Sequence, residues 1–183
     1  MDTLSDNAIM LRVKGGDLDR LGLLFERYHR AVYGFLFHST HCREESEDMV
    51  QLVFYRILKY RGSFTGEGAF VTWMYHLARN VLKDHYKKNK HLSSDYRVEH
   101  MADWLGGGEK ADKAIESEEA KTELYQAMER LQPEHREVLV LSRFQELKYQ
   151  EIAQILNISE GAVKVRVYRA MKELKEIYAK IAM

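Results

Sequence analysis

The sequence predicts an all-α protein built from two small helical domains that are joined by a flexible acidic linker. The chain has 183 residues, of which 45% are hydrophobic, and this is enough for packed cores. It contains one proline and 11 glycines, and its apolar residues recur every three or four positions in several segments. This periodicity fades in one acidic stretch near the middle, so two helical halves are expected.

The N-terminal half predicts four helices. The pair Gly15-Gly16 ends the first helix and Gly62 ends the third, and acids in the first turn of the third helix suit the helix dipole. In the fourth helix, Phe70, Met74, Leu77 and Val81 lie at helical spacing and mark the face expected in the core. The expected helices cover about Asn7–Val13, Leu18–His38, Glu44–Tyr60 and Ala69–Lys88.

The middle of the chain predicts a linker over residues 92–117, between domains at 1–91 and 118–183. Nine acids and four cations lie between Ser93 and Glu123, and three consecutive glycines at 106–108 interrupt any helix. Trp104 and Leu105 stand out in this polar stretch. They are either a pair that docks on a neighbouring surface or an incidental exposed pair.

The C-terminal half predicts a helix-turn-helix. The only proline, Pro133, suits the first turn of a helix over Glu134–Phe144. A short helix at Tyr149–Leu156 and a tight turn follow, and Ser159 is placed to cap a long helix from Glu160 to about Tyr178. The N-terminal part of such a second helix enters the major groove of DNA. From this segment alone, an ordinary helix pair with a solvated basic face remains an alternative.

Candidate DNA-binding residues follow from that placement. Those expected at base edges are Ser159, Glu160, Gly161, Lys164, Val165 and Tyr168. Arg166 and Arg169 are better placed for phosphates.

The segment from Phe64 to Lys90 combines aromatic rings with cations. The formal net charge of the chain is +0, yet five cations and one acid lie between Arg79 and His91. Rings that stack on bases and cations that hold phosphates are suited to an opened nucleic-acid strand. We expect Trp73 in the core, and Tyr75 and His76 more exposed than Trp73.

Two blocks of the N-terminal half and one of the C-terminal half resemble conserved regions of bacterial sigma factors. Residues 47–54 (EDMVQLVF) and 70–88 (FVTWMYHLARNVLKDHYKK) resemble the second region, and residues 131–174 resemble the fourth. The order and separation of these blocks are similar to those of the compact extracytoplasmic-function (ECF) class.

The resemblance implies site residues and partners. It implies that RNA polymerase core is bound through the clamp coiled coil of its largest subunit and its flap region, and that an anti-sigma factor holds the free protein. The implied polymerase-binding residues are Asp48, Gln51, Leu52 and Tyr55. The residues implied to capture the melted minus-10 strand are Phe64, Tyr75, His76, Arg79, Asn80, Lys83 and Lys87, while the C-terminal helix-turn-helix would read the minus-35 duplex.

The sequence argues against an enzyme. It has no phosphate-binding loop, zinc-binding HExxH helix, nucleophile elbow or Cys-x-x-Cys pair, so neither catalysis nor a cofactor is expected. His38, His41 and Cys42 lack a fourth ligand, and no metal site is expected there. No apolar run reaches the roughly 20 residues of a membrane span, and we expect a cytoplasmic protein. The second hypothesis is a helix-turn-helix regulator whose N-terminal half senses a ligand or dimerises.

Overall fold

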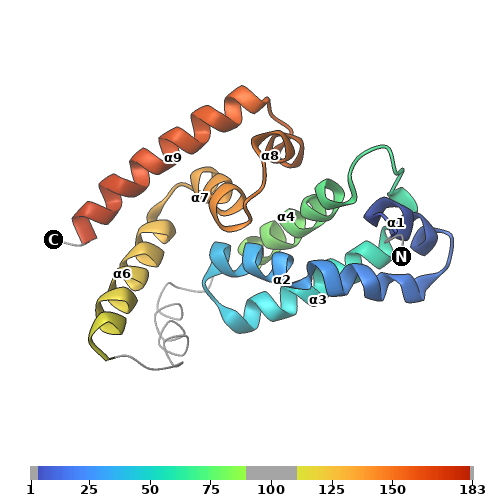
Figure 1. Ribbon diagram of the computed structural model, residues 1–183, viewed down its shortest axis with the longest axis horizontal. Helices are drawn as coiled ribbons and strands as arrows, with labels where there is room; N and C mark the ends of the chain where they lie inside the picture. Colours follow the sequence, from blue (N-terminus) through green and yellow to red (C-terminus); the bar gives the residue numbers. More distant parts are fainter. Residues whose placement is uncertain (1–3, 90–110, 182–183) are drawn as a thin grey trace. The chain divides into compact units, whose positions relative to one another are not determined.

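The computed structural model describes residues 4–89 and 111–181, and every regular element in those ranges is helical (Figure 1). The predicted all-α fold is confirmed. The chain divides into two compact units, Met1–Leu92 and Ser93–Met183.

The N-terminal unit is a bundle in which α2 and α3 form an antiparallel hairpin and α4 packs against both (Figure 1). The short helix α1 contacts α2 and α4. All four predicted helices are present, with ends within a few residues of those expected. Their bounds are Asp6–Lys14 for α1, Leu21–Thr40 for α2, Arg43–Lys59 for α3 and Phe70–Asn89 for α4, with 3₁₀ turns at Leu18–Arg20 and Arg61–Ser63.

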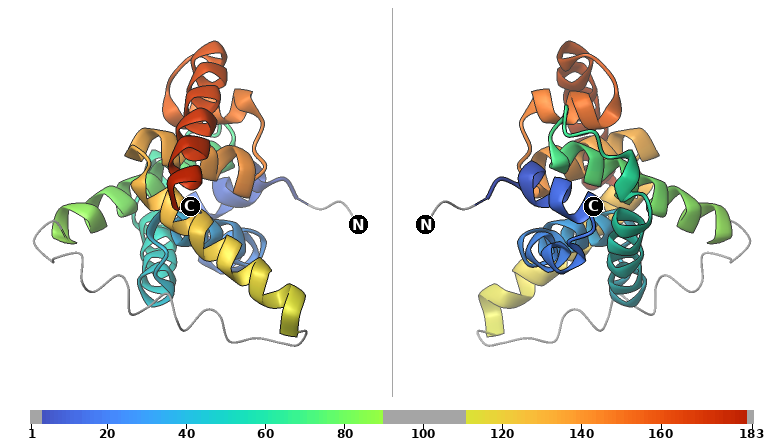
Figure 2. Two further views of the ribbon diagram at one scale, coloured as in Figure 1. Left: turned by 90° about the vertical axis from the view of Figure 1, so that its left-hand side faces the viewer. Right: turned by 90° about the vertical axis from the view of Figure 1, so that its right-hand side faces the viewer.

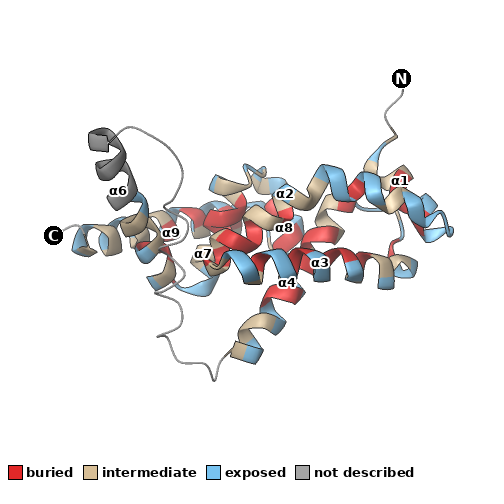
Figure 3. Ribbon diagram, turned by 90° about the horizontal axis from the view of Figure 1, so that it is seen from below, coloured by how far each residue is buried: buried red, intermediate tan, exposed pale blue. Residues whose placement is uncertain are grey.

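The core of this unit is formed by the facing apolar sides of its helices, which are red in Figure 3. Phe35 of α2, Ile57 of α3 and Met74 of α4 have no exposed surface. Each such side chain contributes roughly 1.5–3 kcal/mol by leaving water. The predicted inner face of α4 is confirmed, since Phe70, Met74, Leu77 and Val81 are all buried.

The C-terminal unit is organised around its last helix, which contacts the three helices before it. The elements can be followed from yellow to red in the two side views of Figure 2. Pro133 begins α7 as expected, because its missing N–H is not needed in a first turn. The bounds are Ala111–Arg130 for α6, Pro133–Leu139 for α7, Tyr149–Leu156 for α8 and Glu160–Ile181 for α9.

Two features differ from the sequence expectation. Helix α6 begins at Ala111, inside the segment expected as linker. The expectation relied on apolar periodicity, whereas four of the seven residues at 111–117 are alanine, lysine or glutamate, which favour helix without it. Trp104 and Leu105 lie outside the described residues.

The second difference is a π-helical turn at Val140–Phe144, where a regular helix was expected. The amide of Gln145 donates to the carbonyl of Val140 at 3.0 Å, which is the wider spacing of a π turn. Four consecutive residues, 138–141, are buried there. Four successive side chains point in directions that cover most of a helix's circumference, so the core encloses this part of the chain on most sides.

Candidate nucleic-acid interfaces

The predicted helix-turn-helix is formed by α8, a three-residue turn and α9. Asn157 takes the left-handed conformation that ends α8, with φ of 55°. The hydroxyl of Ser159 accepts a hydrogen bond from the amide of Ala162 at 3.1 Å, which confirms its predicted role as the cap of α9. Ile152 and Val163 are fully buried, so the two helices are held by apolar contact.

The candidate base-reading residues share the exposed side of α9. They are Ser159, Glu160, Gly161, Lys164, Val165 and Tyr168. Lys164 forms an ion pair with Glu160 at 3.0 Å, and Tyr168 is 72% exposed. The row presents a cation, an apolar side chain and an aromatic ring together, and this mixture suits the edges and methyl groups of bases.

Arg166 is placed differently from Arg169. Its guanidinium lies 3.9 Å from the carboxylate of Glu134 at the start of α7, and its side chain is 28% exposed. Arg169 is exposed. A DNA phosphate must compete with the carboxylate of Glu134 for the guanidinium of Arg166. Glu134 does not compete in this way for Arg169.

On α4, polar candidates follow one another along an outer row. His76, Asn80, Lys83 and Lys87 are three or four residues apart, and the last three are exposed. Arg79 stands beside this row and is partly exposed. The row presents an amide that can read a base edge and cations that can hold a strand.

Tyr75 does not belong to that surface. It is 2% exposed, and its ring packs edge-on against Phe35 with centroids 5.5 Å apart. The prediction that Tyr75 is exposed is wrong, because α4 packs against α2 as well as α3 and position 75 faces α2. This ring cannot meet DNA without opening the core.

Phe64 is also buried, at 2% exposure, although the sequence placed it in the strand-binding loop. The centroid of its ring lies 5.4 Å from that of Trp73 and 6.3 Å from that of Phe70, so the three rings form one cluster. Trp73 itself is only partly buried, more exposed than Tyr75. Phe64 thus anchors the start of the loop in the core, and its ring has no open face on which a base could stack.

His76 remains a candidate, in its neutral form. Burial lowers the pKa of His76, and the charges of Arg79 and Lys83 lower it further. The ring is therefore uncharged near pH 7, so His76 can hydrogen-bond or stack but adds no positive charge to the row.

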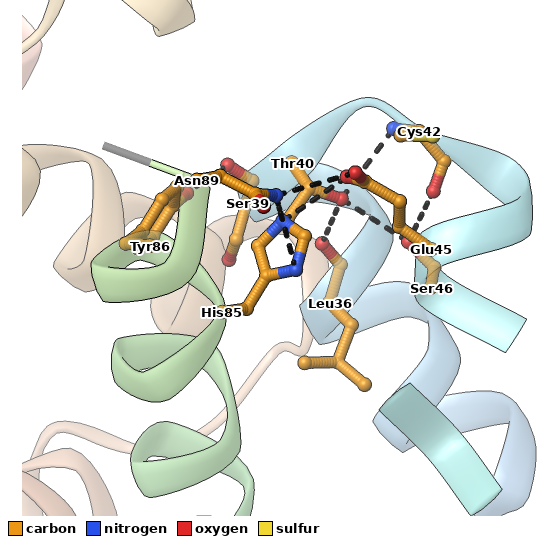
Figure 4. Close-up of polar contacts among 9 residues, drawn as sticks. All are labelled: Leu36, Ser39, Thr40, Cys42, Glu45, Ser46, His85, Tyr86 and Asn89. Atoms are coloured by element: carbon orange, nitrogen blue, oxygen red, sulfur yellow. Dashed lines mark hydrogen bonds and ion pairs between the residues drawn. The ribbon is translucent and has the colours of Figure 1, made fainter. Parts of the chain in front are cut away.

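Ion pairs and hydrogen bonds fix α4 against α3. Asp84 accepts from the guanidinium of Arg56 at 2.7 Å, which explains an acid among cations. The side-chain amide of Asn89 and the ring of His85 lie 3.4 Å and 3.1 Å from the carboxylate of Glu45 (Figure 4). Lys83 and Lys87 therefore project from a helix whose C-terminal end is tied to the start of α3.

The candidate polymerase-binding residues form a second exposed row, on α3. Asp48 and Gln51 are exposed, as are the larger apolar side chains of Leu52 (39%) and Tyr55 (58%). Apolar side chains that remain open to water beside polar ones are typical of a protein-binding surface.

Two family models match the chain, one in each unit. The model of sigma-70 region 2 matches residues 24–92, and the model of sigma-70 region 4 matches residues 121–174. Together they cover more than half of the 183 residues.

The chain belongs to the sigma-70 family, in its ECF class.

Curated relatives agree with this assignment along nearly the whole chain. The RNA polymerase sigma-H factor of Pseudomonas aeruginosa is 28% identical over 176 residues, which cover 92% of this chain and 91% of that protein. The ECF RNA polymerase sigma-E factor of Escherichia coli is 27% identical over 180 residues, 94% of each chain. This sigma factor therefore gives RNA polymerase its promoter choice, and it is not an enzyme.

Solved structures share the fold. CnrH in complex with the cytosolic domain of CnrY matches with a TM-score of 0.72 and 20% identity, over 96% of this chain and 97% of that one. The sigma factor RpoE of Bartonella quintana, in complex with the anti-sigma factor NepR, matches with a TM-score of 0.60 and 19% identity, over 85% and 94%. The alternative of a regulator with a sensing N-terminal half does not account for the region 2 match.

Among the described residues, no group of three or more His, Cys, Asp or Glu side chains is arranged to hold a metal ion. Burial raises the pKa of the Cys42 thiol, so it is a poor ligand and nucleophile. Within the same residues, the sigma factor has no helix that is long and apolar enough to cross a membrane.

Sequence reasoning missed two residues of α1 that reach the loop before α4. Asn7 and Lys14 donate to backbone carbonyls of that loop, at Gly68 and Phe64. Neither has a local signal in the sequence, because each bond joins residues at least 50 positions apart.

Proposed function

We propose that the two units of this sigma factor divide promoter recognition. The N-terminal half of α9 reads the minus-35 element as duplex, and the loop at 64–68 with the outer row of α4 captures the minus-10 strand as it unpairs. The observation that carries the proposal is the row on α4. There an amide and two cations are exposed along one side of a helix whose opposite side is buried in the core.

The proposed roles match the chemistry of each surface. Asn80 offers one donor and one acceptor to the edge of an unpaired base, and Lys83 and Lys87 follow it along the backbone. Lys164 and Tyr168 of α9 are set for the major groove, where donors and apolar contacts distinguish base pairs. Phe64 and Tyr75 are left out of the DNA surface, since both are buried.

The exposed row of α3 is proposed to dock on the clamp coiled coil of the largest polymerase subunit. Its residues are Asp48, Gln51, Leu52 and Tyr55. The C-terminal unit would contact the flap region of the polymerase. We also propose an anti-sigma partner, as in the Bartonella quintana complex, and a place in the cytoplasm, where the polymerase is.

Promoter opening by reconstituted holoenzyme tests the proposal. Asn80→Ala should leave binding to closed duplex within about twofold and slow opening about tenfold, the loss of one or two hydrogen bonds to a base. Opening is followed by the fluorescence of a base analogue in the minus-10 element, and duplex binding by anisotropy. Lys88→Ala is the matched control, an exposed substitution on another side of α4.

The proposal predicts a separation of the two measurements. Normal opening by Asn80→Ala, or an equal loss of duplex binding and opening, would overturn the role of this row.

A further inference from the structure

We propose that α1 positions the strand-capturing loop, with Asn7 as the principal positioning residue, and that α1 thereby sets base selection in the minus-10 element without touching DNA. The inference rests on the proposed function of the loop. It begins with Asn7, Leu11 and Lys14, which share one face of α1 at spacings of four and three residues.

Asn7 uses its whole side-chain amide on the loop and on the start of α4. Its nitrogen donates to the carbonyls of Gly66 at 3.3 Å and Gly68 at 2.9 Å. Its oxygen accepts from the amide of Phe70, the first residue of α4, at 2.8 Å. The first amides of a helix lack partners within it, so Asn7 supplies a cap to α4 from a distant part of the chain.

Lys14 and Leu11 complete the contact. The ammonium of Lys14 donates to the carbonyl of Phe64 at 2.7 Å, at the beginning of the loop. Gly66 has φ of 81°, and a Cβ atom there would lie 3.4 Å from the side chain of Leu11. Both ends and the middle of the loop are thus held by α1, and Gly66 is the residue type that its backbone requires.

Helix α1, which holds the loop, is itself anchored in the core. Ile9, Met10 and Val13 of α1 have no exposed surface. Asp6 accepts from Arg27 at 2.6 Å and from the hydroxyl of Tyr28, so the start of α1 is also tied to α2. A displacement of the loop therefore requires either broken contacts to α1 or movement of a buried helix.

The loop presents its own polar side chains to solvent from this fixed backbone. Thr65 and Glu67 are exposed, and the hydroxyl of Thr65 accepts from the amide of Glu67 at 3.3 Å. A backbone held in one conformation loses less freedom when a base binds, and it discriminates better between bases that fit and bases that do not. Asn7 therefore acts on selectivity through the loop.

Asn7→Asp is the informative substitution, since it keeps the size and the acceptor for Phe70. It replaces the donor by a carboxylate oxygen that faces the carbonyls of Gly66 and Gly68, and this repels the loop. Opening rates are measured with holoenzyme on promoters that carry each of the four bases at each minus-10 position. We expect the preference for the best base at the captured position to fall about tenfold, the equivalent of one or two lost hydrogen bonds.

Lys14→Met is the second variant, because it keeps most of the aliphatic chain and removes the donor. It should lower the same preference, by about threefold. Arg12→Ala, an exposed substitution on another face of α1, is the control and should change nothing. Hydrogen exchange of α2 and α3 in the full chain verifies that each variant is folded.

The base preference separates positioning from stability. Partial unfolding lowers the active fraction equally for all promoters, so an unchanged preference with slower opening would overturn the proposal. A Thr65→Ala, Glu67→Ala double variant distinguishes a failure of the positioning role of α1 from a failure of the base-reading role of the loop. If it alters the preference and Asn7→Asp does not, α1 has no positioning role, whereas if it too has no effect, the loop does not read a base and the proposed function of the loop fails.

Discussion

The two candidate DNA surfaces are built in opposite ways. On α9, the candidate residues belong to one helix and its cap, and within residues 159–169 all of them except Arg166 are exposed. On the N-terminal unit, the surface joins a loop to α4, and the loop is held by α1 across about 60 positions of sequence. Two of its seven candidates, Phe64 and Tyr75, are buried.

This difference shows when a functional surface can be assigned from sequence spacing. Helical spacing places residues on sides of one helix, and α9 has an open side that spacing identifies. It does not tell which other helices cover the remaining sides. Because α4 packs against α1, α2 and α3, the sides of α4 that face these helices are covered, and Tyr75 lies on one of them.

The largest effect should come from the buried aromatic residue. Tyr75→Ala removes a ring packed against Phe35, and should lower the free energy of unfolding of the N-terminal unit by about 3 kcal/mol. Tyr168→Ala on exposed α9 should change that of its own unit by less than about 0.5 kcal/mol. Hydrogen exchange of core amides in the full chain measures both, and equal effects would contradict the contrast between the two surfaces.

A smaller effect is expected for duplex recognition by α9. Lys164→Ala removes the cation that pairs with Glu160 and that we propose to contact the major groove, so holoenzyme should bind a minus-35 duplex about tenfold more weakly. Lys172→Ala, exposed two turns farther along, should stay within about twofold. Anisotropy titrations at several salt concentrations test this, and a loss as large for Lys172→Ala would move the site away from the start of α9.

The cap of α9 should have a moderate effect on stability. Ser159→Ala removes the acceptor for the amide of Ala162 and should cost about 1 kcal/mol in the C-terminal unit. Ser159→Asp retains an acceptor and should restore most of that stability. Hydrogen exchange of the amides in α8 and α9, measured at increasing temperature, reports this stability. A Ser159→Asp variant as unstable as Ser159→Ala would show that the loss of the cap does not cause the destabilisation.

The smallest effect is a dependence on pH confined to the N-terminal unit. Burial, and then the nearby His41, lower the pKa of His38 from 6.5 to about 4. Between these values the unfolded chain binds a proton that the folded chain does not, so acidification from pH 7 to pH 5 favours unfolding. Because His38 is only partly buried, we expect less than about 1 kcal/mol. His38→Gln should flatten that part of the unfolding profile, and an unchanged slope would exclude His38 as its source.

Much of the fold could be predicted because its signals are local. The helices, the turn before α9, the proline at the first position of α7 and the cap at Ser159 depend on residues within a few positions of one another. The start of α6 at Ala111 was missed because a segment without an apolar face has only its propensity to indicate helix. The π turn at 140–144 was missed because apolar spacing does not distinguish its wider hydrogen bonds from those of a regular helix.

The sequence by itself determined the family, the helical character of both units and the exposed face of α9, since spacing and motif order carry that information. Only the tertiary structure decided that Tyr75 and Phe64 are buried in the core and not exposed to DNA. It also decided that Asp84 pairs with Arg56 and that Asn7 holds the loop. The physical reason is that each of these depends on which helices pack together. Such contacts join residues that are distant in the chain and leave no periodic trace in it.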